Sequence, residues 1–228
     1  MSKGKFIVID GTDGTGKATQ TKLLVKRLKK AGVKVHVEDF PQYGKKSAGP
    51  VEDYLTGQYG SAVELGAYVP SVFYAVDRFA ASSRIKRHLR DGYVVVCNRY
   101  VTSNMAHQGG KITNKSKREK YFKWLNEFEY NFMKIPKPDL EIILHLPPKI
   151  SEKLVIKRGP QHYIGAKRLD THEKDINHMN VAEKIYLQIA KKFRYKVVEG
   201  FIDGRLLTPF EVSNIIFPIV KKYLHAKL

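Results

Sequence analysis

The feature that most constrains this chain is a glycine-rich stretch near its start. It occupies residues 11–17 and follows the apolar run Phe6–Ile9, while apolar residues at helical spacing follow it. A strand, a glycine-rich turn and a helix in this order are typical of a P-loop, in which backbone N–H groups and the positive end of a helix dipole hold phosphate. We therefore predict a nucleotide phosphate site formed by Gly11, Thr12, Asp13, Gly14, Thr15, Gly16, Lys17, Ala18 and Thr19.

One position departs from the usual P-loop pattern. The residue after the lysine is normally a serine or threonine whose hydroxyl contacts magnesium, and here it is Ala18, with Thr19 one place later. The sequence therefore predicts that the metal is held differently, or mostly through water and the phosphates of the nucleotide.

Length and composition favour a single domain over residues 1–228. No apolar run reaches the roughly 18 residues of a membrane span, and the chain enters a strand almost at once, so we expect a cytoplasmic protein. The net charge of +19 could indicate nucleic acid as a partner. The basic stretch at residues 115–120 is also typical of a solvated helix face, and anionic nucleotides are sufficient partners, so we expect neither nucleic acid nor a membrane.

The rest of the chain alternates between expected strands and helices. Strands are expected at residues 6–9, 33–41, 93–97, 140–146 and 195–198. Helices are expected after the P-loop, within 47–60, from 70 to 91, over 115–134, from Ser151, over 175–192 and from Pro209. This alternation predicts an α/β fold with a five-stranded, parallel, doubly wound sheet in three α/β/α layers. The helix over 115–134 is expected to bury an apolar stripe of Tyr121, Trp124, Leu125, Phe128 and Phe132.

Loops at the carboxyl ends of strands carry function in such sheets. Phe40 and Tyr43 follow the second strand and are expected to face the P-loop, although core packing explains Phe40 equally well. His107 and Gln108 belong to a dense set of hydrogen-bonding side chains after the third strand. A basic segment at about residues 157–172 predicts a lid over the nucleotide, with a passive surface loop as the alternative.

These motifs are shared with one known family. They comprise residues 10–17, 40–41, 43–44, 77–78, 99–100 and 103–104, together with Phe73, Asp170 and Glu173. Over essentially its whole length the chain resembles the thymidylate kinase family of P-loop nucleoside-monophosphate kinases. The resemblance implies transfer of the γ-phosphoryl group of ATP to the 5′-phosphate of dTMP, with Mg²⁺ accompanying ATP, in a homodimer formed through helices on one sheet face.

The resemblance also implies roles around the acceptor nucleotide. Asp13 is expected near the sugar 3′-hydroxyl, Phe73 on the thymine face and Arg78 at a thymine carbonyl. Asn104 would read the neighbouring ring edge, while His107 stands where the family often has a tyrosine near the deoxy position of the sugar. Tyr43 and Arg99 would hold the acceptor phosphate. The full set expected to bind dTMP is Asp13, Phe40, Tyr43, Phe73, Arg78, Arg99, Asn104, His107 and Gln108.

Catalysis of this reaction needs cations rather than a base, because the acceptor phosphate oxygen is already ionised. Some relatives carry an arginine inside the P-loop where this chain has Gly14, so the lid is expected to supply a further cation. The expected catalytic cations are Lys17 and Arg99, with Arg158, Lys167 or Arg168 from the lid.

A second departure concerns the metal. Asn98 stands where the family typically has an aspartate before the arginine, and with Ala18 it leaves two positions near the metal without a charge or a hydroxyl. Asp13, Asp10 or Glu173 could assist the metal through water, and Asp13 and Glu173 are the candidates we name.

Two other functions remain open at this point. A deoxynucleoside kinase must deprotonate a neutral hydroxyl, and Glu38 or Asp39 could be its base. A P-loop ATPase stimulated by nucleic acid would account for the charge.

Overall fold

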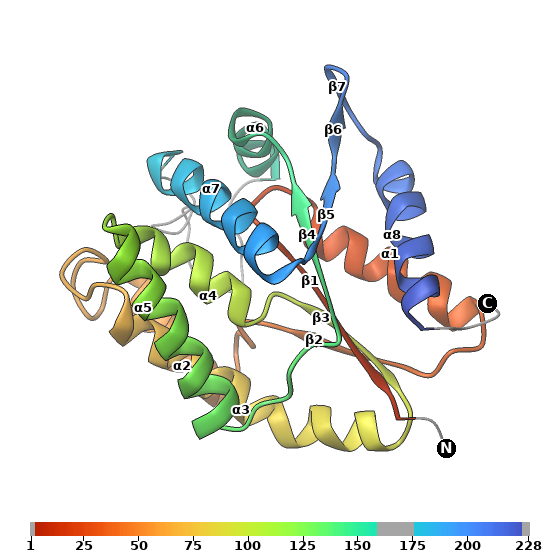
Figure 1. The fold of residues 1–228 in the computed structure, drawn as a ribbon, viewed down its shortest axis with the longest axis horizontal. Coiled ribbons are helices and arrows are strands. Elements are labelled where there is room, and N and C mark those ends of the chain that lie inside the picture. Colours follow the sequence, from red (N-terminus) through yellow and green to blue (C-terminus); the bar gives the residue numbers. More distant parts are fainter. Residues whose placement is uncertain (1–2, 159–175, 225–228) are drawn as a thin grey trace.

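A parallel sheet lies at the centre of the molecule (Figure 1) in a computed structural model that describes residues 3–158 and 176–224. Its strands are β1 (Lys5–Gly11), β2 (Val35–Asp39), β3 (Val94–Asn98), β4 (Leu140–His145) and β5 (Lys196–Glu199). Their spatial order is β2-β3-β1-β4-β5, and every pairing is parallel. This order confirms the predicted doubly wound sheet and places the strand before the P-loop in the middle.

Helices cover both faces of the sheet. Figure 1 shows α1 (Lys17–Lys30) and α8 (Pro209–Tyr223) on one face, with α3 (Tyr68–Arg90), α4 (Val101–His107), α5 (Lys115–Asn126) and α7 (Ile176–Phe193) on the other. Side chains of a strand alternate between faces, so Phe6 and Val8 belong to one core cluster while Ile7 and Ile9 belong to the other. Burial on both faces explains why β1 is an uninterrupted apolar run.

Shorter elements connect these layers. The 3₁₀ turn η1 (Lys46–Ala48) and α2 (Gly49–Thr56) lie between β2 and α3, and the 3₁₀ turn η2 (Gly109–Lys111) follows α4. The π-helix η3 (Glu127–Phe132) continues α5, and α6 (Pro148–Arg158) follows β4. Strands β6 (Phe201–Ile202) and β7 (Arg205–Leu206) form an antiparallel hairpin. None of the helices in the described ranges is both long and apolar enough to cross a membrane.

The aromatic stripe predicted for residues 115–134 is only partly buried. Tyr121 and Leu125 are in the core, but Phe132 is 77% exposed, so the prediction for Phe132 is wrong. The π-helix is the cause, because its wider turn ends the 3.6-residue repeat. Within η3 the fully buried side chain is Glu129 instead.

Two other local features differ from expectation. Helix α6 begins at Pro148, so Ser151 lies inside it rather than at its start. The β6–β7 hairpin adds to the predicted elements, and the signal for it was present, because Asp203-Gly204 is a two-residue hairpin turn whose φ angles are 50° and 76°.

The carboxyl ends of β1, β2 and β3 meet at one edge of the sheet. Asn98 at the end of β3 lies opposite Ile9 of β1 and Asp39 of β2. From this edge Phe40 N donates to Asn98 O at 3.0 Å, and Arg99 N donates to Ile9 O at 3.0 Å. The P-loop and the segments that follow β2 and β3 therefore leave the sheet from neighbouring points.

Candidate active site

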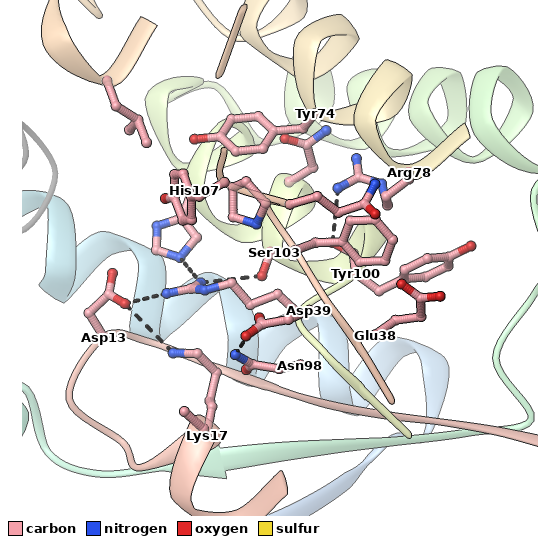
Figure 2. Close-up of a pocket in the computed structure, with 18 of the residues that line it drawn as sticks. Asp13, Lys17, Glu38, Asp39, Tyr74, Arg78, Asn98, Tyr100, Ser103 and His107 are labelled. Atoms are coloured by element: carbon pink, nitrogen blue, oxygen red, sulfur yellow. Dashed lines mark hydrogen bonds and ion pairs between the residues drawn. The ribbon is translucent and has the colours of Figure 1, made fainter. Parts of the chain in front are cut away.

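A crevice of about 720 Å³ lies over this edge of the sheet. Its volume is in the range of small-molecule sites. The P-loop forms one end, and α3 and α4 form the other, with the segments after β2 and β3 between them (Figure 2). Six predicted phosphate-site residues line it directly, namely Asp13, Gly14, Gly16, Lys17, Ala18 and Thr19.

The P-loop backbone folds tightly around its lysine. Gly16 precedes α1 with φ 87°, a left-handed conformation that favours glycine. Lys17 Nζ donates to Thr12 O at 2.8 Å, and Thr15 Oγ1 donates to the same carbonyl at 2.8 Å. Burial and the neighbouring charge of Arg99 lower the pKa of Lys17 to about 8, against the opposing charge of Asp13. The ammonium is thus held at the floor of the crevice, where an anionic ligand would favour its charged form.

Gly14 has a packing reason to lack a side chain. A Cβ at this position would lie 2.3 Å from Ser151 O of α6, and Gly14 has φ 82°. An arginine in the P-loop would therefore collide with the backbone of α6. Arg158, at the other end of the same helix, lines the crevice and adds positive charge near Asp13 and Lys17. The remaining lid cations, Lys167 and Arg168, and the metal candidate Glu173 lie outside the described residues.

Asp13 lies between two of the predicted cations. Arg99 Nη2 donates to Asp13 Oδ1, and Lys17 Nζ is 3.7 Å from the same oxygen. Burial alone would raise the pKa of Asp13, but the charges of Arg99 and Lys17 hold that pKa far below its usual range. Arg99 also donates to Ser103 Oγ at 3.3 Å and lies 3.3 Å from His107 Nε2. Figure 2 shows Asp13, Lys17, Ser103 and His107 around this point.

Asp10 fixes the backbone on which these groups stand. Its Oδ1 accepts hydrogen bonds from Gly11 N at 2.8 Å, Ser103 Oγ at 2.7 Å and Tyr186 OH at 2.7 Å. Its Oδ2 accepts from Tyr100 N at 3.3 Å. Asp10 is fully buried and ties β1, α4 and α7 together, so its oxygens are occupied by structural bonds.

The far end of the crevice contains Tyr74, Arg78, Asn104, His107 and Gln108. Phe73 is not among the lining residues, which corrects the predicted stacking position. It packs against the cluster of Val51, Tyr54 and Leu55, and its ring lies 5.2 Å from that of Tyr59. The helix repeat explains the shift, because Tyr74 rather than Phe73 lies four residues, or one turn, before Arg78. Figure 2 shows the Tyr74 ring across the crevice from Lys17.

Arg78 is held from behind by a buried carboxylate. Its Nε and Nη2 donate to Glu129 Oε2 and Oε1, both at 2.6 Å, and its Nη1 donates to Tyr100 O at 3.4 Å. Burial opposes the charge on Arg78, but Glu129 raises its pKa overall. A guanidinium has five N–H donors, so N–H groups of Arg78 remain after these three bonds.

The segment after β2 is fixed by α3. Asp77 accepts from Gln42 N at 2.8 Å, Gln42 Nε2 at 3.1 Å and Ser47 Oγ at 2.7 Å. Phe40 is buried in the core cluster and also lines the crevice, so both expectations for it hold. Tyr43 lines the crevice as expected, and Lys45 adds a cation that the sequence motifs did not indicate.

Glu38 is poorly suited to act as a base. Its two carboxylate oxygens accept from Arg84 at 2.7 Å each, and His36 Nε2 lies 2.7 Å from Oε1. Burial would raise the pKa of Glu38, but the hydrogen bonds from Arg84 and His36 lower it overall. A carboxylate that already binds a cation in this way accepts a proton reluctantly.

A metal ion would find oxygen ligands at the strand ends rather than a ready-made cluster. Among the described residues there is no group of three or more His, Cys, Asp or Glu side chains arranged to hold a metal. Asp39 Oδ1 accepts from Asn98 Nδ2 at 2.8 Å, and burial raises the pKa of Asp39. Asn98 Oδ1 is buried and has no hydrogen-bond partner in the described part of the chain. The site fits Mg²⁺, which is commonly held by one or two protein oxygens, water and substrate phosphates.

The chain is similar to known proteins over nearly its full length. The thymidylate kinase family model matches residues 9–200. The thymidylate kinase of Caldicellulosiruptor saccharolyticus is 32% identical, over 96% of this chain and 99% of that protein. The thymidylate kinase of Mycobacterium tuberculosis is 28% identical, over 92% of this chain and 100% of that protein. The solved structure of thymidylate kinase from Candida albicans shares the fold with a TM-score of 0.74 at 20% identity, covering 97% of this chain and 93% of that one.

Proposed function

The chain belongs to the thymidylate kinase family, and we propose that its crevice transfers the γ-phosphoryl group of ATP to the 5′-phosphate of dTMP. The products are dTDP and ADP, so the enzyme is a nucleoside-monophosphate kinase that contributes to dTTP synthesis. One observation carries the proposal. A single crevice joins a P-loop with its lysine to a wall of Tyr74, Arg78 and Asn104, which provides a phosphate site and a base site in one continuous space.

The cations of the crevice provide the catalytic power. Lys17 binds the outer phosphates of ATP, and Arg99, fixed by Asp13 and Ser103, binds the acceptor phosphate together with Tyr43. The acceptor oxygen is ionised at neutral pH, so the reaction requires alignment of the two phosphates and neutralisation of their charge. Arg158 approaches from α6 and adds a cation on the side of ATP.

The other end of the crevice selects thymine. Tyr74 stacks on the base, the remaining N–H groups of Arg78 donate to a thymine carbonyl, and Asn104 reads the adjacent ring edge. Aromatic stacking binds any base, whereas directed donors discriminate among bases. Asp13 approaches the 3′-hydroxyl, while His107 and Gln108 border the sugar.

Further parts of the proposal rest on family membership. We propose that Mg²⁺ accompanies ATP and neutralises phosphate charge, that the enzyme is a cytoplasmic homodimer, and that residues 1–228 form one domain with a basic lid. The deoxynucleoside kinase alternative is not favoured by the relatives, and Glu38, one of its two candidate bases, is already held by Arg84 and His36. The alternative of an ATPase stimulated by nucleic acid is not favoured by the relatives.

A coupled ADP-release assay tests the function directly. We expect rapid turnover with dTMP, weaker turnover with other nucleoside monophosphates and none with thymidine. Failure of every monophosphate to support turnover would reject the proposal, and turnover with thymidine alone would favour the nucleoside kinase.

A matched pair of variants tests the base site. Tyr74→Leu removes the proposed stacking surface and should raise the KM for dTMP about tenfold, since base stacking contributes about 1–3 kcal/mol. Phe73→Leu, one residue away and outside the crevice, should leave that KM unchanged. The opposite ranking would return the stacking role to Phe73.

A further inference from the structure

The described crevice contains two carboxylates near the phosphate end, and their surroundings differ. Asp13 is engaged by Arg99 and Lys17. Asp39 has a hydrogen bond from the neutral amide of Asn98 and no ion pair with a described cation within the structure. The charges of Arg99, Lys17 and Lys22 act on Asp39 without forming an ion pair with it. A carboxylate that is open to a phosphate-binding crevice and not paired with a cation would repel ATP. Its position is favourable only if a cation lies between it and the phosphates.

Asn98 adds a second observation. Its Nδ2 donates to Asp39 Oδ1, and because an ionised carboxylate only accepts hydrogen bonds, the amide must turn its NH₂ group toward Asp39. This orientation leaves Oδ1 buried without a hydrogen-bond partner in residues 3–158 and 176–224. Buried polar atoms are nearly always satisfied, and an unsatisfied one often indicates a water molecule or an ion.

The two residues are fixed by the sheet. Asp39 and Asn98 are register partners at the ends of β2 and β3, and both line the crevice with Lys17 (Figure 2). Thr19 lines the same crevice. Ala18, beside Lys17, lacks the hydroxyl that commonly contacts magnesium in P-loops. Oxygen ligands for the metal therefore have to come from elsewhere, and the Asp39–Asn98 pair supplies them at the correct edge of the sheet.

We propose that Asp39 and Asn98 act as one unit that anchors the hydrated Mg²⁺ of MgATP, with Asp39 supplying the negative charge and Asn98 supplying an amide oxygen and the hydrogen bond that orients Asp39. This inference rests on the proposed kinase function and names the protein side of its metal site. The charge is on β2 and the amide is on β3. An aspartate at both positions would bring two carboxylates into hydrogen-bonding distance and raise the proton affinity of both.

The test measures metal binding rather than turnover. Mn²⁺ serves as the probe, with a non-hydrolysable ATP analogue and the full chain, and binding is followed by electron paramagnetic resonance and by calorimetry. Asp39→Asn should weaken Mn²⁺ binding to the protein–analogue complex about tenfold, as loss of residues that orient or support a metal commonly does. In EDTA the same variant should bind the analogue as tightly as the unaltered protein or more tightly, because a negative charge has been removed.

Exchanging the two residues tests whether Asp39 and Asn98 bind the metal or only stabilise the fold. The double variant Asp39→Asn with Asn98→Asp restores one carboxylate and one amide and should recover most of the lost Mn²⁺ affinity. Asp203→Asn, in the exposed β6–β7 turn, removes the same charge far from the crevice and should change nothing.

Three results would overturn the anchor. They are unchanged Mn²⁺ affinity in Asp39→Asn, an equal loss of analogue binding with and without metal, and no recovery in the exchanged variant. Thermal unfolding of each variant identifies a loss of Mn²⁺ affinity that arises from misfolding. If Asp39→Asn is misfolded, the Mn²⁺ affinity of the exchanged variant decides whether the proposal holds. Turnover of dTMP by the unaltered enzyme tests the proposed function separately, so either idea can fail alone.

Discussion

Two arginine–carboxylate pairs border the same crevice, and they differ in how far their charges are withdrawn from solvent. Arg78 and Glu129 are 2% and 0% exposed and are joined by two parallel hydrogen bonds. Arg99 and Asp13 are each 18% exposed, and their hydrogen bonds extend to Ser103, with His107 and Lys17 adjacent. Glu129 is buried behind Arg78, which lines the crevice, while Arg99 and Asp13 both line the space between the P-loop and the acceptor site.

The difference in exposure indicates that the buried pair stabilises the fold, whereas the partly exposed pair takes part in the reaction. Breaking a buried pair leaves an uncompensated charge in a medium of low polarity, so the free energy of unfolding decreases. A pair at the edge of a crevice can exchange partners when an anionic ligand arrives, because water and phosphate both solvate the arginine. We therefore expect substitutions in the Arg78–Glu129 pair to change mainly stability, and substitutions of Arg99 to change mainly turnover.

The largest expected effect is on stability. Glu129→Ala should reduce the free energy of unfolding by about 3–5 kcal/mol, because Arg78 would remain buried without its partner. Asp13→Ala should reduce it by less than Glu129→Ala does, because Arg99 keeps partial contact with solvent and its hydrogen bond to Ser103. Urea denaturation measures both. Equal losses would show that the two pairs are not different in kind.

A double variant sharpens this result. Arg78→Met combined with Glu129→Leu removes both charges and keeps the volume, so it should be more stable than Glu129→Ala alone. A double variant less stable than the single one would contradict this explanation. The loss of stability would then come from the hydrogen bond of Arg78 to Tyr100 O and from the packing around it.

The second effect is on catalysis. Arg99→Ala should reduce kcat/KM for dTMP by about 10²–10³-fold, because a fixed charge aimed at the reacting phosphate is removed. Arg99→Lys should recover only part of the loss, since an ammonium cannot make the forked contacts of a guanidinium. Steady-state kinetics with circular dichroism as a folding check measure this. A loss of fold in Arg99→Ala, with normal specific activity of the folded fraction, would contradict the assignment.

The sequence predicted the Arg99–Asp13 end of the crevice, because that end depends on local sequence patterns. The P-loop and the parallel, doubly wound sheet follow from motifs and an alternation of elements in which spacing fixes geometry, although the spatial order of the strands was not predicted. The same spacing argument would also have identified Tyr74, because it lies one helical turn before Arg78, whereas Phe73 projects about a quarter-turn away.

The other half could not be derived from local pattern. Glu129 is 51 residues from Arg78 in the chain, and it reaches Arg78 only because a π-helix turns it inward. The pairing of Asp39 with Asn98 likewise depends on the register of two strands separated by a long helix. The need for glycine at position 14 likewise arises from Ser151 of α6, which is distant in the chain and packs against it. Contacts between distant segments need the assembled fold, since no periodicity encodes them.

A third carboxyl group extends the comparison, because it is buried without an arginine. Glu141 of β4 accepts a hydrogen bond from Thr102 and borders a groove at the amino ends of β4 and β5, and burial raises its pKa from 4.5 to about 8. Between these values the folded protein retains a proton that the unfolded chain releases. The unfolded state then binds fewer protons, so the free energy of unfolding falls as pH rises from about 4.5 to 8.

The same linkage between protonation and folding gives the size of the pH effect of Glu141 and a control variant for it. We expect a loss on the order of 2 kcal/mol across this window, discounted for water in the groove. Glu141→Gln cannot ionise and keeps a hydrogen-bonding group, so urea midpoints measured from pH 5 to pH 8 should vary less in this variant. Parallel pH profiles for the two proteins would show that Glu141 is ionised in the fold.

The smallest effect is expected for a pair in water. Lys5 Nζ lies 3.4 Å from Asp139 Oδ1, with side chains 38% and 34% exposed. Lys5→Gln should change the free energy of unfolding by less than about 0.5 kcal/mol, because solvent already screens both charges. Asp139→Ala should cost about 1 kcal/mol, since Asp139 Oδ2 also accepts from Phe6 N at 2.8 Å. Urea denaturation at low and high salt measures both variants, and only the Lys5 effect should vanish with salt. A large, salt-resistant loss in Lys5→Gln would mean that burial is not what ranks the arginine pairs, and the contrast between Glu129 and Asp13 would then need another cause.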